Sequence, residues 1–189
     1  MVSHVNTVAL NGIAATTVDV QVQLTGGAAG INIVGLPDNA VKESRERVRG
    51  AFHALGLRLP AKRITVNLAP ADLAKEGSHY DLPIAVAVLM AMGILPADSG
   101  ERAIFMGELG LDGSLSRVPG CLPAAIHGQG EGLTEIFLPV SNAPEAAWAG
   151  ACAVYGAATL QAVMHHILGE EVLSPTQPTR DAALSSVLL

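Results

Sequence analysis

The sequence is poor in aromatic residues, cysteine and charge. Phe, Trp and Tyr make up 3% of its 189 residues and charged residues 15%, whereas half of the residues are hydrophobic. The two cysteines, Cys121 and Cys152, lack CxxC spacing and neighbouring histidines, which favours reduced, buried thiols over a disulfide or a zinc site. The sequence therefore predicts one ordinary domain with a core of many small aliphatic contacts and no metal site.

Long apolar runs and targeting signals are also missing. The apolar stretch 84–95 is shorter than the roughly 20 residues that span a bilayer, so we interpret it as a buried helix. The N-terminal segment MVSHVNTVAL has no cationic start followed by an apolar stretch and a cleavage site. We therefore expect a cytoplasmic protein with no membrane partner.

Charge is distributed unevenly along the chain. The net charge is −6, so the molecule as a whole should not attract nucleic acid. Five cations nevertheless form two groups: a stripe at i, i+3 and i+7 on a predicted helix and a pair at the start of the next strand. They are Lys42, Arg45 and Arg49, then Lys62 and Arg63. A solvated helix face is the plainer interpretation. If instead all five contacted DNA phosphates, log affinity against log salt would have a slope of roughly −4 to −5.

Apolar periodicity predicts a mixed α/β chain with antiparallel N-terminal strands. Apolar and polar residues alternate over 16–24, and the glycines that follow predict a hairpin to a second strand at 31–36. The segment 4–10 could add a third strand. A helix should begin after Asp38 as N-cap and stop at Gly56.

Further along the chain, strands and helices alternate as in a parallel sheet. A strand is expected at 62–69, a central buried helix at 82–93, and a hairpin within 103–118 that turns at Asp112-Gly113. The later elements are expected at 119–132 (helix), 134–139 (strand), 142–150 (short helix), 152–157 (strand) and 159–170 (helix).

A polar loop before the buried helix has the composition of a catalytic loop. Its candidate groove contacts are Lys75, Glu76, Ser78, His79, Tyr80 and Asp81. Adjacent residues in extended backbone point to opposite sides, so Ser78, His79 and Asp81 alone make a poor triad. A turn in which Asp81 caps the helix is the plainer interpretation, and a ligand site is the alternative.

Three motifs carry a resemblance to a known family. They are VGLPDNAVKESRERVRGAF, ITVNLAPADLAKEGSHYDLPIAVAVL and MGELGLDGSLSRVPG. Together they closely resemble the N-terminal domain of ComM/YifB-type proteins, which are often labelled magnesium-chelatase-like, over residues 1 to about 170. The resemblance implies a fold shared with the proteolytic domain of Lon and the C-terminal domain of RadA, a ribosomal-protein-type two-layer α/β sandwich with a mixed sheet.

The resemblance also implies that a Lon-type Ser-Lys dyad has been lost. Aligning Lys75, Glu76 and Gly77 with the start of the Lon catalytic loop places His79 at the serine position. The later helix places Leu122 at the lysine position, and no lysine follows Lys75 in the sequence. A Ser-Lys mechanism needs an amine beside the hydroxyl, so we expect no catalytic residue here.

ComM-type proteins resemble hexameric AAA+ motors that act on branched DNA in recombination and natural transformation. The resemblance implies that residues 171–189 are a linker toward an ATPase module, absent from this chain, that would use ATP and Mg, and that the chain itself needs no cofactor. We expect a non-catalytic domain (residues 1–170) that serves DNA engagement, assembly of a hexameric ring, or both. The alternatives are a divergent peptidase that uses Ser78 or Cys121, and a pure oligomerisation module.

Overall fold

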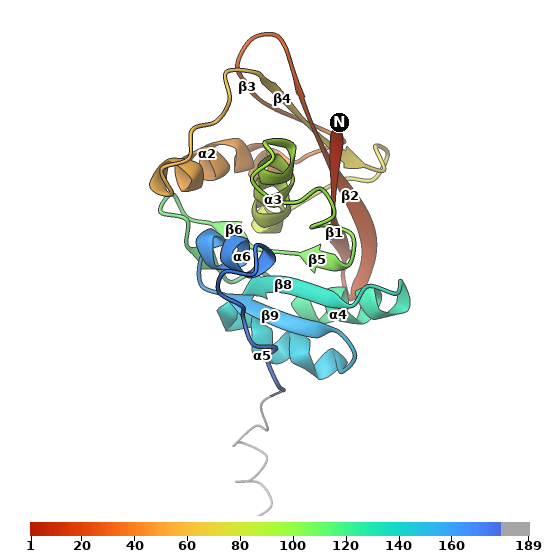
Figure 1. Ribbon diagram of the computed structural model, residues 1–189. Helices are drawn as coiled ribbons and strands as arrows, with labels where there is room; N and C mark the ends of the chain where they lie inside the picture. Colours follow the sequence, from red (N-terminus) through yellow and green to blue (C-terminus); the bar gives the residue numbers. More distant parts are fainter. Residues whose placement is uncertain (179–189) are drawn as a thin grey trace, which may run out of the picture.

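The computed structural model describes residues 1–178, which form an α/β fold around a seven-stranded mixed sheet (Figure 1). The strands lie in the order β3-β4-β2-β1-β5-β8-β9. Their bounds are β1 Val2–Asn11, β2 Ala14–Thr25, β3 Gly30–Val34, β4 Arg63–Ala69, β5 Ala103–Phe105, β8 Glu135–Pro139 and β9 Ala153–Ala157. Most neighbouring strands are parallel, and both antiparallel pairs include β2. The predicted α/β class with antiparallel N-terminal strands is confirmed.

β1 and β2 form a long antiparallel hairpin that turns at Gly12, where φ is +62°. Val18, Val20 and Val22 of β2 are fully buried, while the residues between them are not, as the alternating pattern predicts. The strand expected at 4–10 is confirmed and supplies this hairpin's first arm.

The hairpin expected between 16–24 and 31–36 is wrong. β4 lies between β2 and β3, antiparallel to β2 and parallel to β3, so the glycine-containing segment after β2 connects strands that are not neighbours. A period of two in the sequence shows which face of a strand is buried, but it does not identify the neighbouring strand. Ile64, Val66 and Leu68 of β4 are all buried, which suits a strand inside the sheet.

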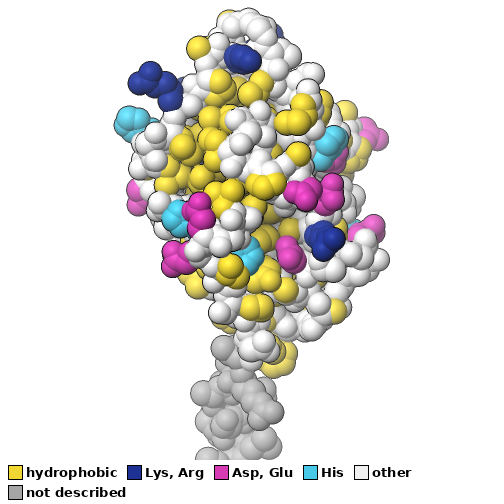
Figure 2. Space-filling model, in the orientation of Figure 1, with side chains coloured by type: hydrophobic (Ala, Val, Ile, Leu, Met, Phe, Trp, Pro, Cys, Tyr) yellow, Lys and Arg dark blue, Asp and Glu magenta, His cyan; other side chains and the backbone are white. Residues whose placement is uncertain are grey.

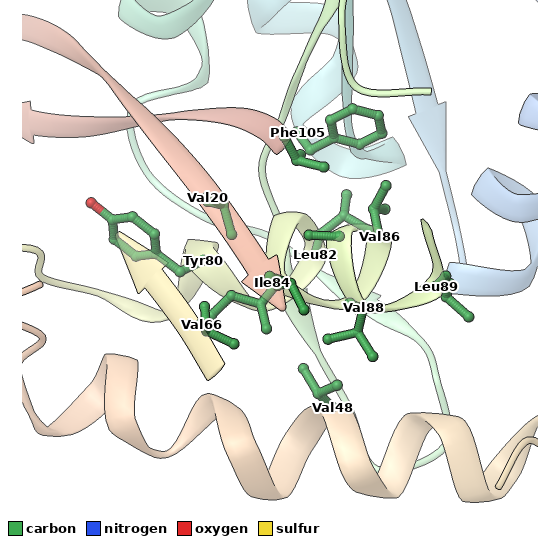
Figure 3. Close-up of a cluster of buried hydrophobic side chains, with 14 of the residues drawn as sticks. Val20, Val48, Val66, Tyr80, Leu82, Ile84, Val86, Val88, Leu89 and Phe105 are labelled. Carbon is green, nitrogen blue, oxygen red and sulfur yellow. The ribbon is translucent and has the colours of Figure 1, made fainter. Parts of the chain in front are cut away.

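The central buried helix is confirmed as α3 (Asp81–Ala91). Every residue from Leu82 to Met90 is buried, and the helix packs against β1, β2 and α2. Figure 3 shows side chains of α3 between Val48 of α2 and the sheet residues Val20 and Val66. The small aliphatic side chains of α3 allow this close packing on all sides.

The helix expected between Asp38 and Gly56 is interrupted. Asp38 caps α1 (Asn39–Lys42) by accepting a hydrogen bond from the Val41 N–H at 2.8 Å, and α2 (Ser44–Ala54) follows after a break at Glu43. Gly56 lies just past α2 with φ of +69°. Both predicted ends are therefore confirmed, and the break lies next to a buried serine, Ser44.

Helices cover both faces of the sheet in its C-terminal half. α4 (Cys121–Gly130) and α5 (Ala143–Ala146) contribute to one apolar cluster, and α3 and α6 (Leu160–Ile167) contribute to the other. β8 faces both, because Ile136 and Leu138 belong to the first cluster and Phe137 to the second. The two-layer description is therefore wrong for this half. Residues 1–178 also contain three short 3₁₀ turns, η1 Ser78–Tyr80, η2 Val140–Asn142 and η3 Ala147–Ala149.

The hairpin that turns at Asp112-Gly113 is confirmed but is shorter than expected. It consists of β6 (Glu108–Leu109) and β7 (Leu115–Ser116), which pair with each other outside the main sheet. The residues expected as its first arm form β5 instead, which pairs in parallel with β1 and β8. The predicted order of later strands and helices, with parallel β8 and β9, is confirmed.

The segment after α6 is hydrogen-bonded to α6 and to the sheet as far as Thr176. The Leu173 N–H donates to His166 Nδ1 and the Thr176 N–H donates to the Val154 carbonyl of β9, both at 2.8 Å. The rest of the expected linker, 179–189, lies outside the described residues. No helix among residues 1–178 is long and apolar enough to cross a membrane.

Candidate functional site

The polar loop leads from β4 into η1 and α3, and the structure separates its six candidate residues into two groups. Lys75, His79, Tyr80 and Asp81 are buried. Glu76 is exposed and Ser78 is half-buried. The groove ligand set predicted from the sequence is therefore not presented to solvent as one surface.

Ser78 is held by a carboxylate and not by a base of the Lon type. Its Oγ donates to Glu108 Oε2 of β6 at 2.6 Å. Within residues 1–178, no lysine amine forms a hydrogen bond to Ser78. A hydroxyl that donates to a carboxylate is held in place, but it lacks the neighbouring lysine that a Ser-Lys mechanism requires.

His79, which the resemblance to Lon was expected to place at the serine position, belongs to the interior. Its side chain is 3% exposed, and Nε2 lies 2.6 Å from the Val8 carbonyl of β1, so Nε2 carries the proton and donates it. Nδ1 faces Gly77, where an added Cβ would lie only 3.3 Å away. Burial lowers the pKa of His79 below its usual range. The ring therefore connects the loop to β1 as a neutral group.

The prediction that Asp81 caps α3 is wrong. Asp81 is the first residue of the helix, and its carboxylate receives hydrogen bonds from Ser44 Oγ at 2.5 Å, Arg47 Nε at 2.6 Å and the Leu109 N–H at 3.0 Å. Burial raises the pKa of Asp81, and the bonds from Arg47 and Ser44 oppose that shift. The carboxylate joins α2, α3 and β6 at one point.

Lys75 and Tyr80 are also buried. The ammonium of Lys75 donates to the Pro70 carbonyl, and burial lowers its pKa. The Tyr80 hydroxyl has no hydrogen-bond partner among the described residues, and burial raises its pKa. Glu76 lines a hollow of 280 Å³ next to β1 and β2.

Leu122, which the resemblance to Lon was expected to place at the lysine position, lies on α4 in apolar surroundings. It lines a hollow of 550 Å³ together with Ile13, Pro123, Ile126 and His127, among others. The helix begins after Gly120, whose φ is +83° and where an added Cβ would lie 2.3 Å from Leu10 Cδ1. Neither position of the expected dyad carries a group that could activate a hydroxyl in the Lon manner.

The cations predicted to form a binding surface are partly brought together. Lys42, Arg45 and Arg63 line a hollow of 390 Å³ with Asn32, Ile33 and Val34 of β3, here called the β3 hollow. Arg45 Nε donates to the Lys42 carbonyl at 3.0 Å. Among residues 1–178, none of the three cations forms an ion pair. Their charges are therefore available to a ligand.

The other two candidate cations lie outside the lining of this hollow. Arg49 pairs with Glu46 at 3.4 Å, and Lys62 is exposed next to Arg63. On the face shown in Figure 2, Lys and Arg side chains lie mostly at the upper end, where β3 and β4 are, and Asp and Glu lie mostly in the middle and lower parts. Charge of the two signs is thus separated on this face.

Several residues of the site were missed from the sequence. Glu108, Ser44 and Arg47 hold the loop and the start of α3, and Asn32 lines the β3 hollow. The position of Arg47 could have been predicted in part from the sequence. Its helical spacing places it off the stripe of Lys42, Arg45 and Arg49, so its side chain must point in another direction.

Comparison with known proteins gives a consistent result. The family model for subunit ChlI of Mg-chelatase matches residues 20–142. The Competence protein ComM of Haemophilus influenzae is 40% identical over 92% of this chain and 34% of its own length. The uncharacterized protein YifB of Escherichia coli is 41% identical over 94% of this chain and 35% of its own length. The chain belongs to the ComM and YifB family.

The region matched by the ChlI family model includes both parts of the site. Residues 20–142 contain the loop at the start of α3, the β3 hollow and Leu122. The chain spans about a third of the length of these two relatives.

Proposed function

We propose that this chain is the non-peptidase, Lon-type domain of a ComM-type AAA+ DNA motor, and that it serves DNA engagement, with assembly of a hexameric ring as a further role. The observation that carries the proposal concerns the two positions expected to hold a Ser-Lys dyad. His79 is buried against β1, and Leu122 lines an apolar hollow. A domain with this loop can hold a partner but has no Lon chemistry with which to cut it. The ATPase module, with ATP and Mg, belongs to the part of such a motor outside this chain.

The DNA contact is assigned to Lys42, Arg45 and Arg63 of the β3 hollow, with Lys62 beside them. These cations are free of carboxylate partners within the described residues, on a chain whose net charge is −6. The rings in the five aromatic pairs of the described residues are buried or half-buried. Trp148 is 56% exposed but does not line the β3 hollow, so the lining of that hollow offers no aromatic ring on which unpaired bases could stack. Duplex and branched DNA are therefore the favoured ligands, bound through their phosphates.

Salt dependence tests this assignment. Four phosphate contacts predict a slope of log affinity against log salt of about −3.6 for duplex DNA, and Lys42→Ala with Arg45→Ala should reduce its magnitude by about 2. Arg49→Ala is the matched control on the same helix, because the Arg49 guanidinium is paired with Glu46. Equal slopes for the double variant and the control would contradict the assignment.

Peptidase activity is tested separately. We expect no labelling of Ser78 or Cys121 by serine-directed or thiol-directed probes and no cleavage of unfolded casein, because Ser78 donates to Glu108 and burial raises the pKa of Cys121 to about 12. Labelling of either residue together with cleavage that is lost in its Ala variant would overturn the non-peptidase proposal.

A further inference from the structure

The two edges of the main sheet differ in how their backbone groups are covered. At the β9 edge, the Thr176 N–H donates to the Val154 carbonyl, so the segment after α6 covers that edge at one position. At the other edge, β3 pairs with β4 and with no other strand of the described residues. An uncovered edge strand is a template for pairing with another extended segment.

The register identifies the uncovered groups of β3. The Gly30 N–H donates to the Lys62 carbonyl at 3.4 Å, so Gly30 faces β4. Because alternate residues of a strand bond to the same neighbour, Asn32 and Val34 also face β4, and the N–H and C=O groups of Ile31 and Ile33 point away from it. The edge therefore offers donors and acceptors at the spacing of a β ladder.

The side chains around this edge define what could pair with it. Lys42, Arg45 and Arg63 line the hollow next to Ile33 and form no ion pair within residues 1–178. Two large apolar side chains stand exposed at the end of the strand, Val34 (48% exposed) and Leu36 (56% exposed). The surroundings of the edge are thus both cationic and apolar.

The backbone bends sharply just past β3. Leu36 has φ of +55°, a conformation that a bulky residue rarely adopts, and its carbonyl accepts the Lys75 N–H at 3.0 Å. Residues in rare backbone conformations cluster at ligand-binding and switch regions of proteins. The bend directs the chain toward α1 and leaves the strand edge open in the described residues.

We propose that the edge of β3 pairs with an extended acidic segment of a protein partner, which adds one strand to the sheet. Backbone pairing at Ile31 and Ile33 supplies affinity, carboxylates of the segment meet the three cations, and its apolar side chains cover Val34 and Leu36. Nucleic acid would use the cations alone, since its phosphates accept hydrogen bonds and offer no N–H donor to the edge carbonyls. The inference goes beyond the proposed function, because DNA binding needs no open strand edge.

The test uses the 189-residue chain and a fluorescein-labelled ten-residue peptide of alternating valine and glutamate, with binding followed by fluorescence anisotropy. Ile33→Pro removes an N–H that makes no bond to β4, so the sheet keeps its ladder. Ile33→Ala loses the same side chain but keeps the N–H. We expect the Pro variant to bind at least about fivefold more weakly than the Ala variant, because one donor is lost and the ring blocks the approaching strand.

Charge is tested on the same probe. Lys42→Ala with Arg45→Ala should weaken peptide binding about fivefold at low salt and less at high salt, and Arg49→Ala should leave it unchanged. A peptide of alternating valine and glutamine should bind more weakly than the glutamate peptide. On binding, the Ile33 amide should gain protection from hydrogen exchange, which a ligand held by charge alone would not produce.

The outcomes separate this inference from the DNA proposal. Equal peptide affinity for Ile33→Pro and Ile33→Ala, or equal affinity for the glutamate and glutamine peptides, overturns the inference. Duplex DNA binding that is unchanged in Ile33→Pro but weakened in the Lys42 and Arg45 double variant, with no peptide binding, also overturns it and leaves the proposed function in place. Peptide binding without DNA binding would instead remove the DNA proposal alone.

Discussion

The buried centre at Asp81 and the β3 hollow use charge in opposite ways. Asp81 is fully buried and receives bonds from Arg47, Ser44 and a backbone N–H, so every charge there is paired inside the fold. Lys42, Arg45 and Arg63 line an open hollow and form no ion pair in the described residues. Both groups draw on α1 and α2 and the segments next to them.

This difference separates stability from binding. A buried charge that loses its partner is strongly destabilising, whereas an exposed and unpaired cation contributes little to the folded state. The loop before α3, which looks catalytic in sequence, therefore belongs to the part of the molecule that holds the fold together. The four predictions below test the contrast.

The largest effect is expected for Asp81→Ala. The substitution leaves Arg47 and the Leu109 N–H without their acceptor, which should lower the free energy of unfolding by about 3–5 kcal/mol. Denaturant unfolding measures it. Glu43→Ala is the control, since Glu43 also pairs with Arg47, at 3.4 Å, but its side chain is 67% exposed, and its loss should cost less than about 1 kcal/mol. Similar losses for the two variants would contradict the contrast.

A pH dependence of stability is expected from His79. Burial lowers its pKa in the folded state, so the unfolded state, with a pKa near 6.5, binds more protons as the pH falls. The free energy of unfolding should therefore decrease below about pH 6.5, by up to about 1.4 kcal/mol per pH unit. His166, whose pKa burial also lowers, adds to the slope. His79→Asn should flatten the profile between pH 7 and pH 5, and an unaltered profile would show that His79 is not the group responsible.

Ser78→Ala should cost about 1 kcal/mol of stability, the worth of one hydrogen bond, because Ser78 donates to Glu108 at 2.6 Å. Glu108→Ala in the Ser78→Ala background should add less than it does in the natural chain. A double-mutant cycle measures this coupling. Additive losses would mean that the two side chains do not depend on one another.

The smallest effect on stability is expected for Lys42→Ala with Arg45→Ala, which should change the free energy of unfolding by no more than about 0.5 kcal/mol. Among these variants, the same double variant should show the largest loss of ligand affinity. It should therefore combine the smallest change in stability with the largest change in binding. A loss of stability comparable to that of Asp81→Ala would mean that these cations support the fold.

Local patterns in the sequence predicted most elements but not all of their partners. The alternation over 16–24 and the apolar run in α3 identified β2 and the central helix. The pattern of apolar residues within a strand or helix shows which of its faces are buried. The pairing of β2 was wrong, because the strand that lies beside it, β4, comes about forty residues later and leaves no local signal.

In the candidate site, too, local sequence patterns predicted neighbours along one helix but not contacts between residues far apart in the chain. Lys42 and Arg45 were predicted to share a surface from helical spacing alone, and they do. Arg63 joins them because β4 pairs with β3, which the sequence did not reveal. Asp81 satisfied the N-cap pattern, but Ser44 and Arg47, 37 and 34 residues away, supply stronger partners. Tertiary contacts overrode the local rule at that position.

Seven strands leave six spacings between β3 and β9, about 29 Å at ~4.8 Å per spacing. A ligand at the β3 rim and the backbone tethered at Thr176 on the β9 rim are thus too far apart to compete. Between the two rims, β1 and β5 are joined at one paired position, Asn6 with Ile104, so the β3 and β9 ends of the sheet meet at a narrow junction. The two rims therefore serve as separate attachment points on one molecule.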